Sequence, residues 1–408
     1  MANGFEPQKI RNVVVVGHKG VGKTTLIEGM LYVGGSTPAM GSIATKTSVL
    51  DDEPEEITRE GTLSTSVGHV VWNDTKINII DTPGEGSFFG DTRLAMAAAD
   101  AVILVVSGKD GVQPMTDRLN HWAIEMGLPR FLVFSKCDLE HIHLEPVIES
   151  VKKRLKLSLA HMQVTVGEGS DLKGLVDLLG RKVYVGTPDG PKTKASDAIP
   201  EEVKDVVEEA RMRLVDEIAS TDDELTEKYL DQGDLSDKEM EAGMHKAISS
   251  GSLVPLYYFA GGSPYGVIPL LDAIVDYFPP ATTRTEVRSK GQEPEIREAK
   301  PEAALTAFCF KTTIDQHAGR NAIVRILSGT LKSDAYILNG DSKERVGGIF
   351  NVVGKPAGSA LGEAYAGDIV SIAKLKTVKT GDTITEDKKP FVFDAPEVPP
   401  ALFARVVI

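Results

Sequence analysis

The feature that most constrains this chain is a glycine-rich segment near its N-terminus, at residues 17–24. It reads Gly-His-Lys-Gly-Val-Gly-Lys-Thr and fits the G-x-x-x-x-G-K-[ST] pattern, after a valine-rich run and before a helical pattern. Such a loop points successive backbone N–H groups at phosphates, beside a helix N-terminus whose dipole favours anions. We therefore predict that it binds a nucleoside triphosphate, with Lys23 on the β- and γ-phosphates and the Thr24 hydroxyl on Mg²⁺. Further nucleotide contacts are expected from His18, Lys19, Gly20, Val21, Gly22 and Thr25.

Two more short motifs follow at the ends of predicted strands. Asp81-Thr82-Pro83-Gly84 comes about 55 residues after the first loop; Asp81 would hold Mg²⁺ through water, and the Gly84 N–H would contact the γ-phosphate. Residues 135–138 read Ser-Lys-Cys-Asp, where a guanine-reading loop normally reads N-K-x-D. Asp138 would accept from guanine N1–H and N2–H₂, and the stem of Lys136 would cover the base. Either motif alone also fits a plain surface turn, but three loops in this order favour GTP and GDP.

The surrounding pattern predicts an α/β P-loop nucleotide-binding fold with a doubly wound, mainly parallel sheet. Short apolar runs bounded by turn residues indicate buried strands, and helical stretches alternate with them. The predicted strands are residues 12–16, 77–80, 102–106, 131–134 and 256–259, and the clearest helices are residues 91–99 and 115–126.

The alternation breaks between residues 158 and 250, which we interpret as an inserted α+β subdomain. Pro200 is expected to open a long amphipathic helix, and Thr221 with Glu224, and Ser236 with Glu239, have the spacing of capping boxes. Residues 196–248 hold 17 Asp or Glu against 6 Lys or Arg, a local charge of −11 out of −14 for the chain. The rest of the chain is therefore close to neutral and could approach RNA.

The sequence predicts further domains beyond the nucleotide-binding one, which takes residues 1–157 and 251–281. Residues 282–302 have no periodic apolar pattern and are interpreted as a linker. Residues 303–390 contain short alternating segments separated by turns such as Ser328-Gly329 and Asn339-Gly340, which predicts an all-β barrel domain. Residues 391–408 are expected to begin a truncated third domain, with a new strand at residues 401–408.

Composition narrows the class of protein. Hydrophobic content is 41% and charged content 25%, as in globular proteins, and no apolar run approaches the ~20 residues of a membrane span. The first residues do not resemble a signal peptide. Cys137 and Cys309 lack partners at metal-ligand spacing and fit reduced thiols. We expect a cytoplasmic monomer that binds neither membrane nor DNA.

With these loops in order, the chain resembles the N-terminal part of elongation factor G and its paralogues, the translational GTPases. The resemblance covers essentially all 408 residues. It includes the Gly-His that starts the phosphate loop and the segments at residues 99–101, 111–113, 173–177, 328–332, 344–347 and 366–368. It implies an inserted subdomain, a β-barrel second domain, and the ribosome as partner, including its rRNA and stalk protein.

The resemblance also implies roles for residues outside the three loops. Residues 55–64 resemble the first switch, in which Thr62 would reach Mg²⁺ when GTP is bound. Ala260 and Gly261 stand where the family has a loop that backs the base. The residues expected to serve hydrolysis are Lys23, Thr62, Gly84 and Glu85.

Two departures from the family pattern bear on catalysis. Glu85 stands where the family has the histidine that orients the attacking water, and Gly20 replaces a usual aspartate. A carboxylate near a triphosphate is repelled by it, so Glu85 would turn away or need a cation partner. The sequence therefore leaves three hypotheses open: a ribosome-associated GTPase of translocation or recycling, a GTP-dependent switch that hydrolyses slowly or not at all, and a ribosome protection protein.

Overall fold

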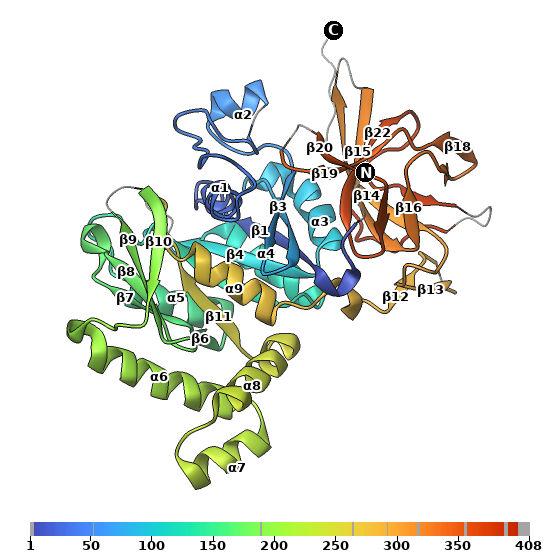
Figure 1. Cartoon of the computed structure of the whole chain (residues 1–408). Coiled ribbons are helices and arrows are strands. Elements are labelled where there is room, and N and C mark those ends of the chain that lie inside the picture. The colour runs from blue at the N-terminus through green and yellow to red at the C-terminus, as the bar shows by residue number, and fades with distance from the viewer. Residues whose placement is uncertain are drawn as a thin grey trace.

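The computed structural model describes residues 4–51, 53–187, 190–262, 265–291, 293–315, 319–354, 357–386 and 391–398. Its N-terminal part, up to residue 277, is built on a seven-stranded sheet in the order β2-β3-β1-β4-β5-β11-β6 (Figure 1). All neighbouring strands are parallel except β2, which pairs antiparallel with β3. The strands are β1 (Ile10–Gly17), β2 (Ser66–Trp72), β3 (Thr75–Asp81), β4 (Ala101–Ser107), β5 (Arg130–Ser135), β6 (Leu159–His161) and β11 (Val254–Tyr258).

Helices cover both faces of this sheet, because alternate strand residues point to opposite sides. Val13 and Val15 of β1 belong to one core with α1 and α9, whereas Val14 and Val16 belong to a second core with α3, α4 and α5. The predicted doubly wound α/β fold is thus confirmed. The helices are α1 (Lys23–Val33), the short α2 (Pro54–Arg59), α3 (Phe89–Ala98), α4 (Pro114–Glu125), α5 (Leu144–Leu155) and α9 (Val267–Tyr277).

The inserted part combines a small antiparallel sheet with three helices, as the α+β prediction requires. The sheet has the order β10-β9-β8-β7, and the helices extend away from the central sheet (Figure 1). Strand β6 lies inside the range predicted for the insert, yet pairs with β11 in the central sheet. The elements are β7 (Gln163–Val166), β8 (Gly174–Asp177), β9 (Lys182–Thr187), β10 (Gly190–Ser196), α6 (Lys204–Ala219), α7 (Asp223–Gln232) and α8 (Asp237–Ser250).

The predicted helix starts in the insert are confirmed in one case and corrected in another. Ser236 and Glu239 form the expected capping box of α8. Helix α7 is capped by Asp222, whose side chain accepts from two backbone N–H groups, so the assignment of Thr221 as its cap was wrong. An aspartate one residue closer to the helix reaches those groups directly.

The segment interpreted as a linker is partly structured. Strands β12 (Glu286–Arg288) and β13 (Ile296–Glu298) pair antiparallel, and Val287 and Arg297 are buried. Residues 391–398 add an isolated bridge between Ser289 and Phe393, and the strand expected at residues 401–408 lies outside the described residues.

The predicted β domain is an antiparallel half-barrel with its own core. Its eight-stranded sheet has the order β18-β17-β23-β14-β15-β22-β19-β20, and β16 pairs with β21 beside it. The strands are β14 (Thr306–Asp315), β15 (Gly319–Ser328), β16 (Thr330–Lys332), β17 (Tyr336–Asn339), β18 (Ser342–Arg345), β19 (Ile349–Val352), β20 (Ala357–Leu361), β21 (Glu363–Tyr365), β22 (Ile369–Leu375) and β23 (Thr383–Thr385).

A buried polar network joins the half-barrel to the central sheet. Lys76 Nζ lies 2.7 Å from Asp368 Oδ1, and both side chains are almost fully buried. Lys76 also donates to Asn351, and Asn78 donates to Asp368. Buried charges are tolerated only when paired and hydrogen-bonded, so this network fixes how the two parts meet. None of the helices in the described part of the chain has the length and apolarity needed to span a bilayer.

Candidate nucleotide-binding site

The predicted phosphate loop connects β1 to α1 at the carboxyl edge of the sheet. Gly20 and Gly22 have φ values of +76° and +94°, a left-handed conformation that side chains other than glycine rarely adopt. A Cβ on Gly17 would lie 2.5 Å from the Val105 carbonyl oxygen, so the loop also passes too close to β4 for any side chain there. Helix α1 then starts at Lys23, which directs its N-terminal dipole at the loop.

The side chain of Lys23 folds back from the start of α1 over this loop. Its side chain is buried, and its Nζ donates to the His18 carbonyl oxygen at 3.1 Å. Burial lowers the pKa of Lys23, while the nearby carboxylates of Asp81 and Asp51 act in the opposite direction. An ammonium group on a glycine-rich loop, with its charge poorly solvated, is suited to bind phosphate oxygens.

Four oxygen-bearing side chains lie beside Lys23. Thr24 Oγ1 donates to Asp81 Oδ2 at 2.7 Å and lies 3.0 Å from Thr62 Oγ1, which in turn donates to Asp51 Oδ2 at 3.2 Å. The structure thus brings the predicted metal ligands Thr24, Thr62 and Asp81 together. Asp51 was not predicted from the sequence; it precedes Thr62 by 11 residues and lies just before the segment at residues 55–64 that resembles the first switch.

The negative charges of the two carboxyl groups in this cluster, Asp51 and Asp81, are only partly offset by neighbouring groups. Burial raises the pKa of Asp51 to about 7 and that of Asp81 to about 6; the charge of Asp81 further raises the pKa of Asp51. Asp51 Oδ1 is a buried acceptor with no hydrogen-bond partner among the described residues. Carboxylate and hydroxyl oxygens are preferred ligands of Mg²⁺, which usually also binds nucleotide phosphates and water. These residues therefore fit a Mg²⁺ ion shared with a bound nucleotide.

The loop after β3 packs directly against the phosphate loop. A Cβ on Gly84 would lie 2.5 Å from Lys23 Nζ and 2.6 Å from the Lys19 backbone nitrogen, so only glycine fits there. The neighbouring Glu85 has the cation partner that its charge requires: its Oε2 lies 3.0 Å from Lys19 Nζ. Hydrogen bonding to Lys19, followed by the charge of Lys19, lowers the pKa of Glu85, which is therefore ionised at neutral pH.

The predicted base-reading loop is tied to the phosphate loop. The Ser135 hydroxyl donates to the Val21 carbonyl oxygen, so the serine that replaces the usual asparagine links the two loops. The Gly262 N–H donates to Asp138 Oδ2 at 3.1 Å. A Cβ on Gly261 would lie 3.2 Å from Thr25 Cγ2.

The remaining predicted base contacts lie on the same side. Lys136 has a left-handed backbone, with φ +59°, and its Nζ lies 3.9 Å from Asp110 Oδ2. Ala260 lies two residues after the end of β11 and forms an isolated bridge with Tyr265. The segment after β11 and the one after β5 thus converge around Asp138, as a base-binding edge requires.

The comparisons with known proteins agree with this architecture. A family model described as the elongation factor Tu GTP-binding domain matches residues 8–280, and one described as domain 2 of elongation factor G matches residues 304–387. The chain belongs to the translational GTPases of the elongation factor G type. It is therefore a member of a GTP-binding elongation factor family, and its first domain is of a kind that binds guanine nucleotides.

A crystal structure of a protein from Thermus thermophilus is also similar to this GTPase. The two share 28% sequence identity with a TM-score of 0.81, over 98% of this chain and 56% of the other. The chain thus spans about half the length of that relative. The roles assigned to individual site residues stay predictions, to which the geometry adds Asp51.

Proposed function

We propose that this chain binds GTP with Mg²⁺ and, as part of a cytoplasmic factor that acts as a monomer on the ribosome, hydrolyses GTP to GDP and phosphate in translocation or ribosome recycling. The observation that carries the proposal is the convergence of Thr24, Thr62 and Asp81 beside Lys23. The loop that holds Asp138 is tied to the same phosphate loop through Ser135 and Val21. The domain division predicted from the sequence, with its insert, linker and second domain, belongs to this proposal.

Each residue of the site has a defined task in this proposal. Lys23 and the backbone N–H groups of residues 18–25 hold the phosphates, and the Gly84 N–H contacts the γ-phosphate. Thr24, Thr62 and Asp81, with Asp51 beside them, hold Mg²⁺, which supplies positive charge to the phosphate oxygens when it is bound. Asp138 accepts from the guanine edge, while Lys136, Ala260 and Gly261 border the base.

Guanine recognition is testable by one substitution. Asp138→Asn replaces an acceptor of two N–H groups by a neutral amide, so we expect roughly 100-fold weaker GDP binding, because a bidentate charge-assisted contact is lost. Xanthosine diphosphate, which has an oxygen in place of the 2-amino group, should gain affinity in the same variant. Glu140→Gln, on an exposed residue two positions further, is the matched control. Unchanged GDP affinity in Asp138→Asn would remove this residue from the base site.

A second candidate, a GTP-dependent switch with slow hydrolysis, is favoured by the Lys19–Glu85 pair. The Glu85 carboxylate, which Lys19 keeps ionised, has no proton to donate. It therefore cannot act on the attacking water as the imidazole of the family histidine does. GTP turnover by the full-length protein, with and without ribosomes, separates the two functions. If Glu85→His strongly raises ribosome-stimulated turnover, the natural chain is a slow switch; if turnover is fast and falls in Glu85→His and Glu85→Gln, Glu85 takes part in hydrolysis.

The acidic insert is proposed to contact the ribosomal stalk protein. Glu202 and Glu208 are exposed on its surface, where a negative face would steer toward a basic partner. Charge reversal at Glu201, Glu202 and Glu208 should slow association with ribosomes at low salt. Equal association rates before and after reversal would disprove this contact.

A further inference from the structure

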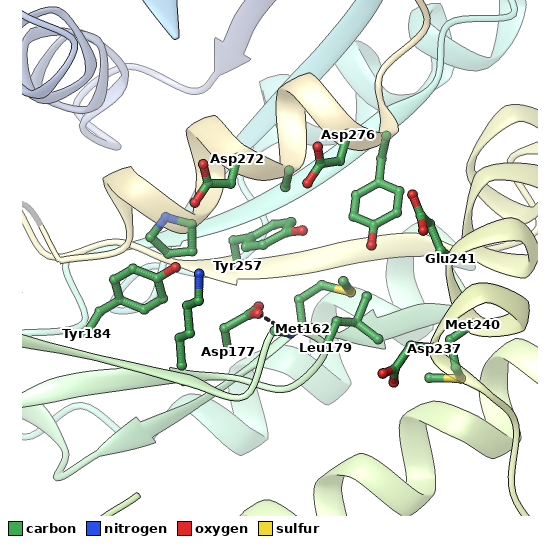
Figure 2. Close-up of a pocket in the computed structure, with 15 residues that line it drawn as sticks. Met162, Asp177, Leu179, Tyr184, Asp237, Met240, Glu241, Tyr257, Asp272 and Asp276 are labelled. Atoms are coloured by element: carbon green, nitrogen blue, oxygen red, sulfur yellow. Dashed lines mark hydrogen bonds between the residues drawn. The ribbon is translucent and has the colours of Figure 1, made fainter. Parts of the chain in front are cut away.

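A separate cavity of about 470 Å³ lies between the insert and the central sheet. Strand β11 and helix α9 of the nucleotide-binding domain form one side, and β8, β9 and α8 of the insert form the other (Figure 2). None of its lining residues belongs to the predicted nucleotide site. The cavity is therefore a second place where the fold could hold a ligand.

The lining is strongly acidic. Five carboxyl groups meet there, against Lys182 as the one cation among the described lining residues; they are Asp177, Asp237, Glu241, Asp272 and Asp276. Burial and the charge of Asp272 raise the pKa of Asp177 to about 6. Figure 2 shows Asp177 and Asp276 pointing from opposite sides toward the space around Tyr257. Such a concentration of like charge is unfavourable unless a cation offsets it.

Protein partners satisfy only part of this charge. Asp272 accepts from the Trp72 indole N–H at 2.7 Å, and Asp237 lies 3.5 Å from Arg211. Asp276 and Glu241, in contrast, make no hydrogen bond or ion pair with any described residue, although the charges of His245 and Arg11 act on Asp276 from a greater distance. The unpaired charge is thus at the end of the cavity formed by α8 and the C-terminal turn of α9.

Two buried tyrosines provide an independent sign of a ligand. Tyr257 is 1% exposed and Tyr184 is 4% exposed, yet neither hydroxyl has a hydrogen-bond partner in the described part of the chain. Both hydroxyl oxygens keep accessible surface at the cavity, so water or a ligand there supplies their hydrogen bonds. Their rings, with that of Tyr277, also offer aromatic faces, which attract ammonium groups.

A linear molecule with several ammonium groups suits this cavity better than a metal ion. No group of three or more His, Cys, Asp or Glu side chains among the described residues is placed to hold a metal, so at most two of these carboxylates could share one. A flexible chain with separated charges can reach them in turn, and its methylene groups can pack on Tyr257, Met162 and Met240. The volume is within the range of small-molecule pockets.

We propose that this cavity binds an aliphatic polyamine, whose ammonium groups pair with Asp177, Asp276 and Glu241. The bound cation would contact both the insert and α9, and would therefore stabilise the way they pack together.

Calorimetric titration of the full chain with spermidine at low ionic strength tests the proposal. We expect one site, and at least about ten-fold weaker binding in Asp276→Asn/Glu241→Gln, because two charge-assisted contacts are lost. Tyr257→Phe, which removes only a hydroxyl, should weaken binding about three-fold or more. The matched control is Asp223→Asn/Glu224→Gln, which removes the same charge from an exposed part of α7 and should leave affinity unchanged. GDP affinity, measured for every variant, verifies that each one is folded.

Three results would overturn the proposal. Equal weakening in the cavity and α7 variants would mean general attraction to an acidic chain. Competition by Mg²⁺ at equal concentration would point to a metal site instead. Binding of a lysine-rich peptide without any binding of spermidine would assign the cavity to a basic protein segment.

Discussion

Glu28 of α1 provides a direct test of how the loop of residues 41–50, which precedes the switch-like segment, is held in place. Its side chain is 1% exposed, and it accepts hydrogen bonds from four groups of residues 41–50. Oε1 accepts from the Ser48 hydroxyl at 2.6 Å, the Val49 N–H at 2.7 Å and the Leu50 N–H at 3.4 Å, and Oε2 accepts from the Gly41 N–H at 3.2 Å. One buried carboxylate therefore fixes the segment that leads into Asp51 and its contact with Thr62.

Glu28→Gln keeps the shape of this side chain and removes its charge. The amide oxygen can still serve Ser48 and Val49, but its NH₂ group then faces the N–H of Gly41. Losing charge assistance in two short bonds costs about 1 kcal/mol each, and the lost acceptor costs about 1 more. The loop should thus open about 3 kcal/mol more easily, which corresponds to roughly 100-fold faster hydrogen exchange at its amides.

Hydrogen exchange at the amides of Gly41, Val49 and Leu50 measures this change directly. Glu55→Gln is the matched control, because Glu55 is exposed on α2 and the chemical change is the same. If Glu28→Gln accelerates exchange at these amides by less than about three-fold, and no more than Glu55→Gln does, Glu28 does not hold the loop in place. Equal acceleration throughout the central sheet would mean global unfolding instead of loop release.

Two further predictions concern buried charge. Lys76→Met should lower the free energy of unfolding in urea by about 3–5 kcal/mol, because Asp368 is left buried and unpaired; Arg345→Met, in an exposed ion pair, should cost about 1 kcal/mol or less. The raised pKa values of Asp51, about 7, and Asp81, about 6, mean that both must lose protons to hold Mg²⁺. Magnesium-dependent GDP affinity should therefore rise from about pH 5 to pH 8 with proton release. Stability without Mg²⁺ should fall from about pH 4, near the ordinary pKa of an aspartate, to about pH 7, the pKa of Asp51 in the folded protein. A flat pH profile in calorimetry would contradict both expectations.

Sequence alone predicted the loops that follow strands. Residues 17–24, 81–84 and 135–138 each follow a strand of one parallel sheet, and the carboxyl ends of such strands meet at the same edge. Local motif and strand order therefore suffice to bring Thr24, Asp81 and Asp138 to one site. The motif alone did not predict the role of Ser135, which departs from the usual asparagine and whose hydroxyl donates to the Val21 carbonyl oxygen.

Residues that depend on long-range packing were harder to predict. Asp51 belongs to the site only because the loop before β2 folds back onto Asp81, and no local pattern marks that return. Strands β12 and β13 have three residues each, too few for an alternating pattern to be visible. The cavity beside Tyr257 likewise results from packing between the insert and α9, elements far apart in the sequence.

Contact between the loop of residues 41–50 and the half-barrel suggests how nucleotide state could reach the second domain. Gly354 donates its N–H to the Val67 carbonyl oxygen, and a Cβ on it would lie 2.0 Å from the Val49 carbonyl oxygen. Val67 is fixed in β2, so Val49 is the side of this contact that can move when the loop rearranges.

Gly354→Ala tests this contact, and Gly340→Ala is its control. Both glycines have φ near +60°, at +62° and +57°, so an alanine strains both backbones alike, but a Cβ on Gly340 meets nothing within 4 Å. The difference between the two variants therefore isolates the contact with Val49. We expect Gly354→Ala to lose about 1–3 kcal/mol more than Gly340→Ala in urea unfolding, since the added methyl must displace one of two packed backbones. It should also accelerate exchange at Val49, as Glu28→Gln does; if the two alanine variants behave alike, the loop and the half-barrel are not coupled through this glycine.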